Sequence, residues 1–329
     1  MRTVILTACM AVLATGCSGG GSESGTSELS GIIRIDGSST VFPITEAVAE
    51  EFRREFPNVK VPVGVSGTGG GFKKFCIGEI DINDASRLIK EKEEKQGKEN
   101  SIDYIEIPVA FDGISLVINP KNDFVDHLTV DELKKIWEPG SKVSNWSQVR
   151  AGWPDKPMVL YGPGPDSGTF DYFTKAINGK EHVCRPDYTA SEDDNVLVHG
   201  VSGDQGALGY FGFAYFDENR GKVNAVPVSM NGNAVLPSQK TINDGSYRPL
   251  SRPIFIYVST KSAEREEVQE FVRFYLKNAP KLAADVGYVP LPQDAYDAAL
   301  ECFEKRITGS TFRGSAPGVS VSELLKNRL

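Results

Sequence analysis

The feature that most constrains the fold is a mainly apolar run of 14 residues, 105–118. Strands in globular proteins usually have about five or six residues, so this run is long for one strand. Its length suits a strand that leaves the sheet of one lobe and enters the sheet of another. We therefore expect two lobes, with a second crossover strand returning at 253–259.

Strands alternate with helices on both sides of that run. Apolar and alternating segments predict strands, some of them ending in turns, at 32–35, 58–65, 80–87, 157–161 and 207–216. Amphipathic segments predict helices at 44–52, 129–137, 170–177, 191–198 and 263–277. Alternation of this kind favours an open, mostly parallel sheet that is covered by helices.

The expected fold class is therefore α/β, with two lobes that each contain a mostly parallel sheet flanked by helices, joined by two crossover strands. Residues 31–112 and 253–329 are expected to form lobe 1, and residues 113–252 to form lobe 2. The chain has 329 residues, 40% of them hydrophobic, which is enough for two lobes of ordinary size.

Residues 1–16 have the pattern of a secretory signal peptide, with Arg2, a short apolar run and small residues at the end. The Gly16-Cys17 junction resembles a bacterial lipobox, which predicts lipidation of Cys17. Residues 17–30 are rich in Gly and Ser and would form a flexible tether. We expect a lipid-anchored protein in the periplasm or on the outer face of the cell membrane. The alternative is a plain signal that releases a soluble periplasmic or secreted protein.

Composition argues against several classes of partner. The formal net charge is −8 and no stripe of Lys and Arg is present, so a nucleic-acid partner is not expected. The sequence has no C-x-x-C motif and its three histidines lack ligand-like spacing, so we expect no metal and no cofactor. Cys76, Cys184 and Cys302 allow at most one disulfide within the chain, whose pairing the sequence does not indicate.

Three segments share one design, in which a strand end is followed by small Ser-, Thr- or Gly-rich residues and then by a helix. The first N–H groups of a helix lack partners within the helix and carry a partial positive charge, so this design binds anions. A single segment predicts no more than a capped helix, but three segments shared between two lobes favour a common anion site. The candidate ligands are Ser39, Thr40, Val41, Ser66, Gly67, Ser167, Gly168 and Thr169.

A tetrahedral oxyanion also needs charge neutralisation, and Arg87 at a strand end could supply a bidentate guanidinium. A salt bridge at the surface is the alternative for Arg87. Hydrogen phosphate carries a proton that sulfate lacks, so an acceptor carboxylate would favour phosphate over sulfate. Asp84 and Asp166 are both candidates for this acceptor, with Asp84 slightly preferred. The alternative for Asp84 is a residue at a strand end that hydrogen-bonds to nearby backbone. The alternative for Asp166 is a residue that stabilises the dipole of the helix that follows it.

Known enzyme motifs are incomplete in this chain. Residues 166–169 spell the Asp-Ser-Gly-Thr signature of an aspartic protease, but such an enzyme needs two carboxylates and neither Asp-Ser-Gly nor Asp-Thr-Gly recurs. Residues 64–68 break the G-x-S-x-G pattern of serine hydrolases at its last position. We therefore expect a protein that is not an enzyme, with a secreted hydrolase as an alternative.

Five short motifs together resemble a known family. They are residues 37–44, 66–71, 81–87, 166–169 and 206–211. In this order they are similar to the phosphate-binding protein, the PstS family, of the bacterial phosphate-specific ABC importer. The resemblance implies a class II periplasmic binding protein that holds phosphate in its cleft through backbone amides, hydroxyls, an arginine and an acidic acceptor. The expected partners are inorganic phosphate and ABC permease subunits, and we expect the chain to be a monomer.

One departure from the family pattern concerns charge. In the best-known branch an arginine stands four residues before the serine of Ser-Gly-Thr, and an aspartate follows Ala-Ser in the first lobe. Here those positions are Pro163 and Arg87, so the arginine of the site is expected in the first lobe and not in the second. Either Asp84 or Asp166 could then be the acceptor. The alternatives to phosphate delivery are a receptor for sulfate or molybdate and a phosphate sensor without transport.

Overall fold

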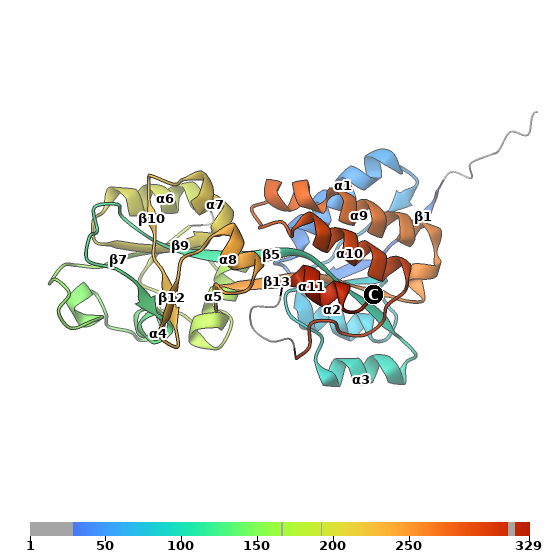
Figure 1. The fold of residues 1–329 in the computed structure, drawn as a ribbon, viewed down its shortest axis with the longest axis horizontal. Coiled ribbons are helices and arrows are strands. Elements are labelled where there is room, and N and C mark those ends of the chain that lie inside the picture. Colours follow the sequence, from blue (N-terminus) through green and yellow to red (C-terminus); the bar gives the residue numbers. More distant parts are fainter. Residues whose placement is uncertain (1–28, 166, 192, 315–319) are drawn as a thin grey trace, which may run out of the picture.

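The computed structural model describes residues 29–165, 167–191, 193–314 and 320–329 of the chain. The predicted signal peptide, Cys17, nearly all of the tether and Asp166 lie outside the described residues. Figure 1 shows two lobes side by side, joined by the strands β5 (Tyr104–Ile118) and β13 (Ser251–Ser259). Among the described residues, no helix has both the length and the apolar character needed to cross a membrane.

Lobe 1 is built around β2 (Ile35–Gly37) and β4 (Ile82–Ala85), which pair in parallel, and β4 pairs antiparallel with β13. A separate parallel pair is formed by β1 (Gly31–Ile32) and β3 (Val59–Lys60). The helices of this lobe are α1 (Phe42–Glu55), α2 (Gly67–Phe75), α3 (Glu91–Glu99), η2 (Ser262–Glu264), α9 (Glu266–Asp285), α10 (Gln293–Glu304) and α11 (Val321–Lys326).

Lobe 2 contains β9 (Ala207–Gly212), which is antiparallel to β5 and parallel to β7 (Val159–Gly162). Its other strands are β6 (Leu128–Thr129), β8 (Thr189–Ala190), β10 (Asn224–Ala225), β11 (Val228–Met230) and β12 (Asn233–Val235). Its helices are α4 (Val130–Trp137), η1 (Trp146–Gln148), α5 (Gly168–Asn178), α6 (Asp194–Gly203), α7 (Phe213–Glu218) and α8 (Gln239–Asn243).

The two crossover strands run antiparallel to each other, from Tyr104 opposite Ser259 to Gly113 opposite Ser251. Every residue of β5 is buried. Because β5 and β13 are long enough to pair with strands of both lobes, they join the two sheets into one sheet of eight strands, in the order β2-β4-β13-β5-β9-β7-β8, with β10 beside β5. The predicted α/β fold with two crossover strands is confirmed.

Each lobe has its own aromatic core beside this sheet. In lobe 1, α1 packs on α9, and the rings of Phe52 and Phe271 meet edge to face with centroids 5.2 Å apart. In lobe 2, the fully buried Trp137 lies edge to face on Tyr210 at 5.0 Å. Edge-to-face geometry is a favourable arrangement for such ring pairs. Each lobe therefore has a packed aromatic core of its own beside the shared sheet.

The three cysteines of the described residues, Cys76, Cys184 and Cys302, are free thiols. Cys76 and Cys302 are buried and Cys184 is partly buried. Burial raises the pKa of Cys76 and of Cys184 to about 11 in each case. Such thiols are inert near neutral pH, because the thiolate is the reactive form.

Candidate functional site

The lobes meet where α1 and α5 begin. A Cβ atom placed on Gly168 would lie 3.1 Å from Oγ1 and 3.2 Å from Cα of Thr40. These two residues come from the first and the third of the predicted anion-binding segments, so the structure brings those segments together across the cleft. A Cβ at this position would be tighter than most real contacts, so the two helix starts would have to move apart by a few tenths of an ångström.

A cavity of about 380 Å³ opens beside this contact. It is lined by the first two predicted segments and by residues of the opposite lobe. The candidate ligands among the lining residues are Ser39, Thr40, Ser66, Gly67 and Arg87. Ser86, Lys175 and Arg252, which the sequence did not single out, also line it.

The start of α1 is held by Ser38. The hydroxyl of Ser38 accepts the N–H of Thr40 at 3.2 Å, and its carbonyl accepts the N–H groups of Val41 and Phe42 at 3.1 and 3.0 Å. Val41 is fully buried and its N–H is engaged in this turn. The part of this segment that borders the cavity is therefore Ser38, Ser39 and Thr40.

The start of α2 is held by Asp36. Its Oδ1 accepts both the N–H of Ser66 at 2.9 Å and the Ser66 hydroxyl at 2.6 Å, and Lys74 donates to its Oδ2. Burial raises the pKa of the Asp36 carboxyl, but the hydrogen bonds from Lys74 and Ser66 outweigh burial and lower it overall. Since Ser66 gives its proton to a carboxylate, its oxygen presents lone pairs to the cavity. Gly67 follows with a φ of +74°, a conformation that favours glycine.

Ser167 is the N-cap of α5, and its hydroxyl accepts the N–H of Thr169 at 3.2 Å. Thr169 lines a second cavity of about 380 Å³ together with Asp112 of β5 and Tyr288. Tyr288 donates its hydroxyl proton to the carbonyl of Thr40 at 2.6 Å. The α5 start thus borders the cleft on the side of the crossover strands.

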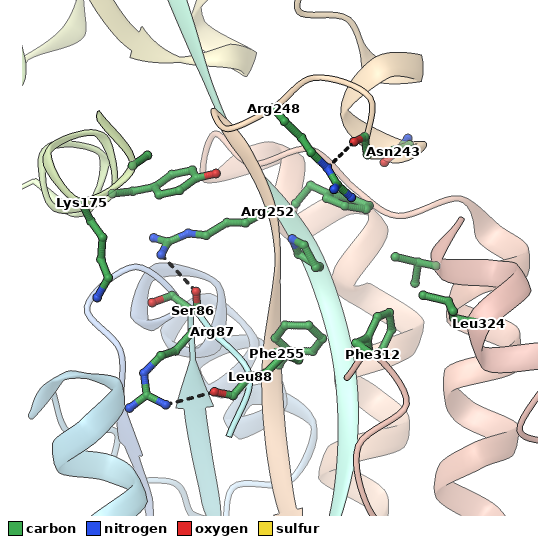
Figure 2. Close-up of a pocket in the computed structure, with 16 residues that line it drawn as sticks. Ser86, Arg87, Leu88, Lys175, Asn243, Arg248, Arg252, Phe255, Phe312 and Leu324 are labelled. Atoms are coloured by element: carbon green, nitrogen blue, oxygen red, sulfur yellow. Dashed lines mark hydrogen bonds between the residues drawn. The ribbon is translucent and has the colours of Figure 1, made fainter. Parts of the chain in front are cut away.

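Arg252, on the return crossover strand β13, connects the parts of the site. Its guanidinium donates to the carbonyl of Ser86 at 3.0 Å, to Oγ1 of Thr40 at 3.4 Å and to Oδ2 of Asp112 at 3.2 Å. It also lies over the ring of Tyr172 of α5, 3.8 Å from the centroid. Figure 2 shows Arg252 reaching from β13 toward Ser86, with Lys175 beyond it. One side chain therefore contacts both lobes and both crossover strands.

Asp112 is the carboxylate partner of Arg252 and was also missed by the sequence analysis. It is 3% exposed and lies opposite Arg252 in the strand register. Burial raises the pKa of Asp112 above its ordinary value, and Arg252 partly offsets this by favouring the charged form. The sequence did contain a signal for this pair, because Asp112 is an acidic residue inside one crossover strand and Arg252 is a basic residue at the start of the other.

Arg87 lines the cavity, but its guanidinium is already paired. It donates to both carboxylate oxygens of Glu93, at 2.8 Å each, and to the carbonyl of Leu88 at 3.0 Å. Burial raises the pKa of Glu93, and the hydrogen bond from Arg87 more than offsets this, so the pKa lies below its ordinary value. Arg87 thus forms a salt bridge at the edge of the cavity. This was the alternative to a ligand-binding role for Arg87.

Asp84 lies behind the cavity and does not line it. The carboxyl is fully buried, and its Oδ1 accepts the hydroxyl of Thr45 at 3.0 Å. Burial raises the pKa of Asp84 well above its ordinary value. Its backbone carbonyl accepts the N–H of Ser38 at 3.0 Å, so Asp84 supports the α1 start from behind. Asp166, the other candidate acceptor, lies outside the described residues.

Two α/β lobes joined by two crossover strands, with helix starts and an arginine gathered between them, define a ligand-binding receptor of the PBP class. A family model described as a PBP superfamily domain matches residues 22–279. The chain belongs to this superfamily and, within it, to the family of the phosphate-binding proteins named PstS.

Individual relatives agree with this assignment. Protein SphX of Synechococcus elongatus is 52% identical over 299 residues, covering 90% of this chain and 88% of its own. The phosphate-binding protein PstS of Staphylococcus aureus is 39% identical over 287 residues, covering 87% and 86%. A crystal structure described as a possible phosphate-binding protein from Planctomyces limnophilus has 51% identity and a TM-score of 0.81, covering 84% of this chain and 99% of its own. The last two proteins are both named for phosphate binding.

Proposed function

We propose that this protein binds inorganic phosphate outside the cytoplasm and delivers it to the permease of an ABC transporter. The observation that carries the proposal is Arg252, which meets the α1 start and the α5 helix at the point where the lobes touch. The family membership and the names of the relatives support phosphate as the ligand. On this proposal the chain has no enzymatic activity of its own.

Phosphate is held in this proposal by groups from both lobes. The candidates are the hydroxyls and N–H groups of Ser39, Thr40, Ser167, Gly168 and Thr169, together with the guanidinium of Arg252. Ser66 is a weaker candidate, because Asp36 accepts both its N–H and its hydroxyl proton. Six to eight charge-assisted hydrogen bonds would give very roughly 9 to 24 kcal/mol gross. Immobilising the ligand takes back at least about 4 kcal/mol. The net range, roughly 5 to 20 kcal/mol, includes the value of about 8 kcal/mol that micromolar affinity needs.

We propose Asp112 as the acceptor of the phosphate proton. It is a buried carboxylate beside Arg252 and Thr169, and Arg252 favours its ionised form. A carboxylate in this position accepts the P–OH of hydrogen phosphate and repels sulfate, which has no proton to give. Burial raises the pKa of both Asp84 and Asp112, but an arginine partly offsets this only at Asp112. Asp84 is the weaker candidate, because its carboxyl also lies behind the cavity and does not line it.

Transport in this proposal depends on hinge closure. Because ligand contacts come from both lobes, phosphate favours the closed arrangement over the open one. Asp112 and Arg252 belong to the crossover strands about which the lobes would turn. Lipidation of Cys17 would keep a monomeric receptor near the permease, and the tether allows a reach of roughly 20 Å.

Isothermal titration of residues 31–329 with phosphate, sulfate and arsenate tests the proposal. We expect micromolar or tighter binding of phosphate, similar binding of arsenate, which has the same shape and also carries a proton, and binding of sulfate at least about 100-fold weaker. If sulfate bound as tightly as phosphate, the acceptor argument for Asp112 would be wrong. Failure to bind phosphate at all would contradict the proposed function.

A further inference from the structure

A third interlobe cavity lies next to the proposed phosphate site and has a different chemical character. Its volume is about 390 Å³. Its apolar wall comes from β13 and the C-terminal part of the chain, and includes Pro253, Phe255, Phe312 and Leu324. Figure 2 shows Phe255, Phe312 and Leu324 on one side of this cavity and Lys175 and Arg252 on the other. We call this cavity the hinge pocket.

The polar part of the hinge pocket is cationic. Arg87, Lys175, Arg248 and Arg252 line it, and none of the described lining residues carries a carboxylate. Arg87, Lys175 and Arg252 each pair with a carboxylate outside the pocket. Arg248 differs from them, because its Nε donates only to the carbonyl of Gly245 at 2.8 Å and no described carboxylate lies within salt-bridge distance. A positive charge is therefore available to a ligand.

A neutral polar group completes this lining. The side-chain Oδ1 of Asn243 is buried and has no hydrogen-bond partner among the described residues. An acceptor of this kind is satisfied by an N–H or O–H group of a ligand. Figure 2 shows Asn243 on the same side of the pocket as Arg248. A ligand head that carries both an anion and a hydrogen-bond donor matches the two residues.

We propose that the hinge pocket binds a small organic anion with an aromatic body and one anionic head. Arg248 neutralises the head, Asn243 accepts a hydrogen bond from a donor near the head, and the body packs on the ring of Phe255 and the side chain of Leu324. The volume lies in the range of small-molecule sites, which are mostly apolar with a few placed polar groups. Inorganic phosphate would leave the apolar wall without a partner, so this ligand differs from that of the cleft.

The hinge pocket and the phosphate cavity share four lining residues, Ser86, Arg87, Lys175 and Arg252. Two anions that contact one guanidinium from two sides lie close together. Because the place is partly buried, their repulsion is only weakly screened by water. Occupation of the hinge pocket therefore weakens phosphate binding. By thermodynamic reciprocity, phosphate weakens binding in the hinge pocket by the same factor.

The test uses the fluorescent probe 8-anilinonaphthalene-1-sulfonate, which has an aromatic body, one sulfonate and one N–H donor. It is titrated against the protein in phosphate-free buffer, with saturable one-to-one binding as the expected result. Arg248→Gln and Leu324→Glu should each weaken the probe by at least about tenfold, since one removes the free cation and the other adds a carboxylate. Both variants should keep the wild-type affinity for phosphate.

Arg220→Gln is the control, because Arg220 is another exposed arginine and lines a different surface cavity, where it lies over the ring of Phe216. It should leave probe binding unchanged. The hinge-pocket site is overturned if the probe does not saturate, or if Arg248→Gln and Leu324→Glu bind it as the wild type does. The coupling is overturned if saturating phosphate leaves probe affinity unchanged. Loss of phosphate binding alone would contradict the proposed function and not this site.

Discussion

At the scale of single residues, Arg252 has the central place in the proposed phosphate site. Its guanidinium contacts lobe 1 through Thr40 and lobe 2 through the ring of Tyr172, and it pairs with Asp112 of the other crossover strand. Both arginines pair with a carboxylate, but the partner of Arg87, Glu93, lies within lobe 1. The two arginines therefore differ in what phosphate would gain from each of them.

Replacing Arg252 by glutamine should weaken phosphate binding by at least about 100-fold. The variant loses charge-assisted hydrogen bonds worth about 1.5 to 3 kcal/mol each and leaves the Asp112 carboxylate unpaired beside an anion. Arg87→Gln is the matched control and should lose less than about tenfold. Isothermal titration of both variants measures the difference. An equal loss in Arg87→Gln would return the main cationic role to Arg87.

The proposed backbone ligands could be read from the sequence more easily than the charged ones. Ser39, Thr40 and Gly168 were candidates because helix starts bind anions through local structure alone, and their role as ligands stays a prediction. Asp112 and Arg252 are 140 residues apart, and they meet only through the register of two antiparallel strands. A register of that kind depends on the whole sheet, so one sequence without its fold does not provide it.

At the scale of elements, the strand and helix types were mostly predictable and their limits were not. The expected strand at 58–65 contains only β3, Val59–Lys60, as a regular strand. Pro62 follows shortly after and cannot donate to a ladder. The expected helix at 263–277 continues to Asp285 as α9, because its buried apolar face extends that far along α1 and the sheet. Packing set the end of α9, and local propensity did not.

The contact between the starts of α1 and α5 can be tested with one methyl group. Gly168→Ala adds a Cβ that meets Thr40 at 3.1 to 3.2 Å, so the helices must move apart by a few tenths of an ångström for the lobes to close. We expect about tenfold weaker phosphate binding, the usual range for overpacking. The melting temperature without phosphate should change by less than about 2 °C, since alanine is well tolerated in a helix.

Gly203→Ala is the control for this variant, because a Cβ at Gly203, at the end of α6, meets no atom within 4 Å. It should bind phosphate as the wild type does. Wild-type affinity in Gly168→Ala would mean that the α1 and α5 starts do not approach this closely when phosphate is bound. Both measurements use isothermal titration and thermal melting of the same preparations.

At the scale of the whole molecule, the eight-stranded sheet couples the lobes mechanically. Its two central strands, β5 and β13, belong to both lobes, so a lobe cannot unfold without releasing strands from the other. The length of the run at 105–118 predicted this arrangement, because no single lobe could use so long a strand. The sequence did not predict that the two sheets would become one, since this depends on how β9 pairs with β5.

This coupling predicts one cooperative unfolding transition for both lobes, which phosphate moves to higher temperature. A ligand at 100 times its Kd stabilises the folded state by about 2.7 kcal/mol. For a chain of this size that corresponds to a rise of about 5 °C in Tm. Differential scanning calorimetry of residues 31–329 with and without phosphate measures both quantities. At the same phosphate concentration, Arg252→Gln should show a rise of less than about 1 °C, because the weakened site is no longer saturated. Two separate transitions, with phosphate moving only one of them, would show that the crossover strands do not join the lobes into a single folding unit.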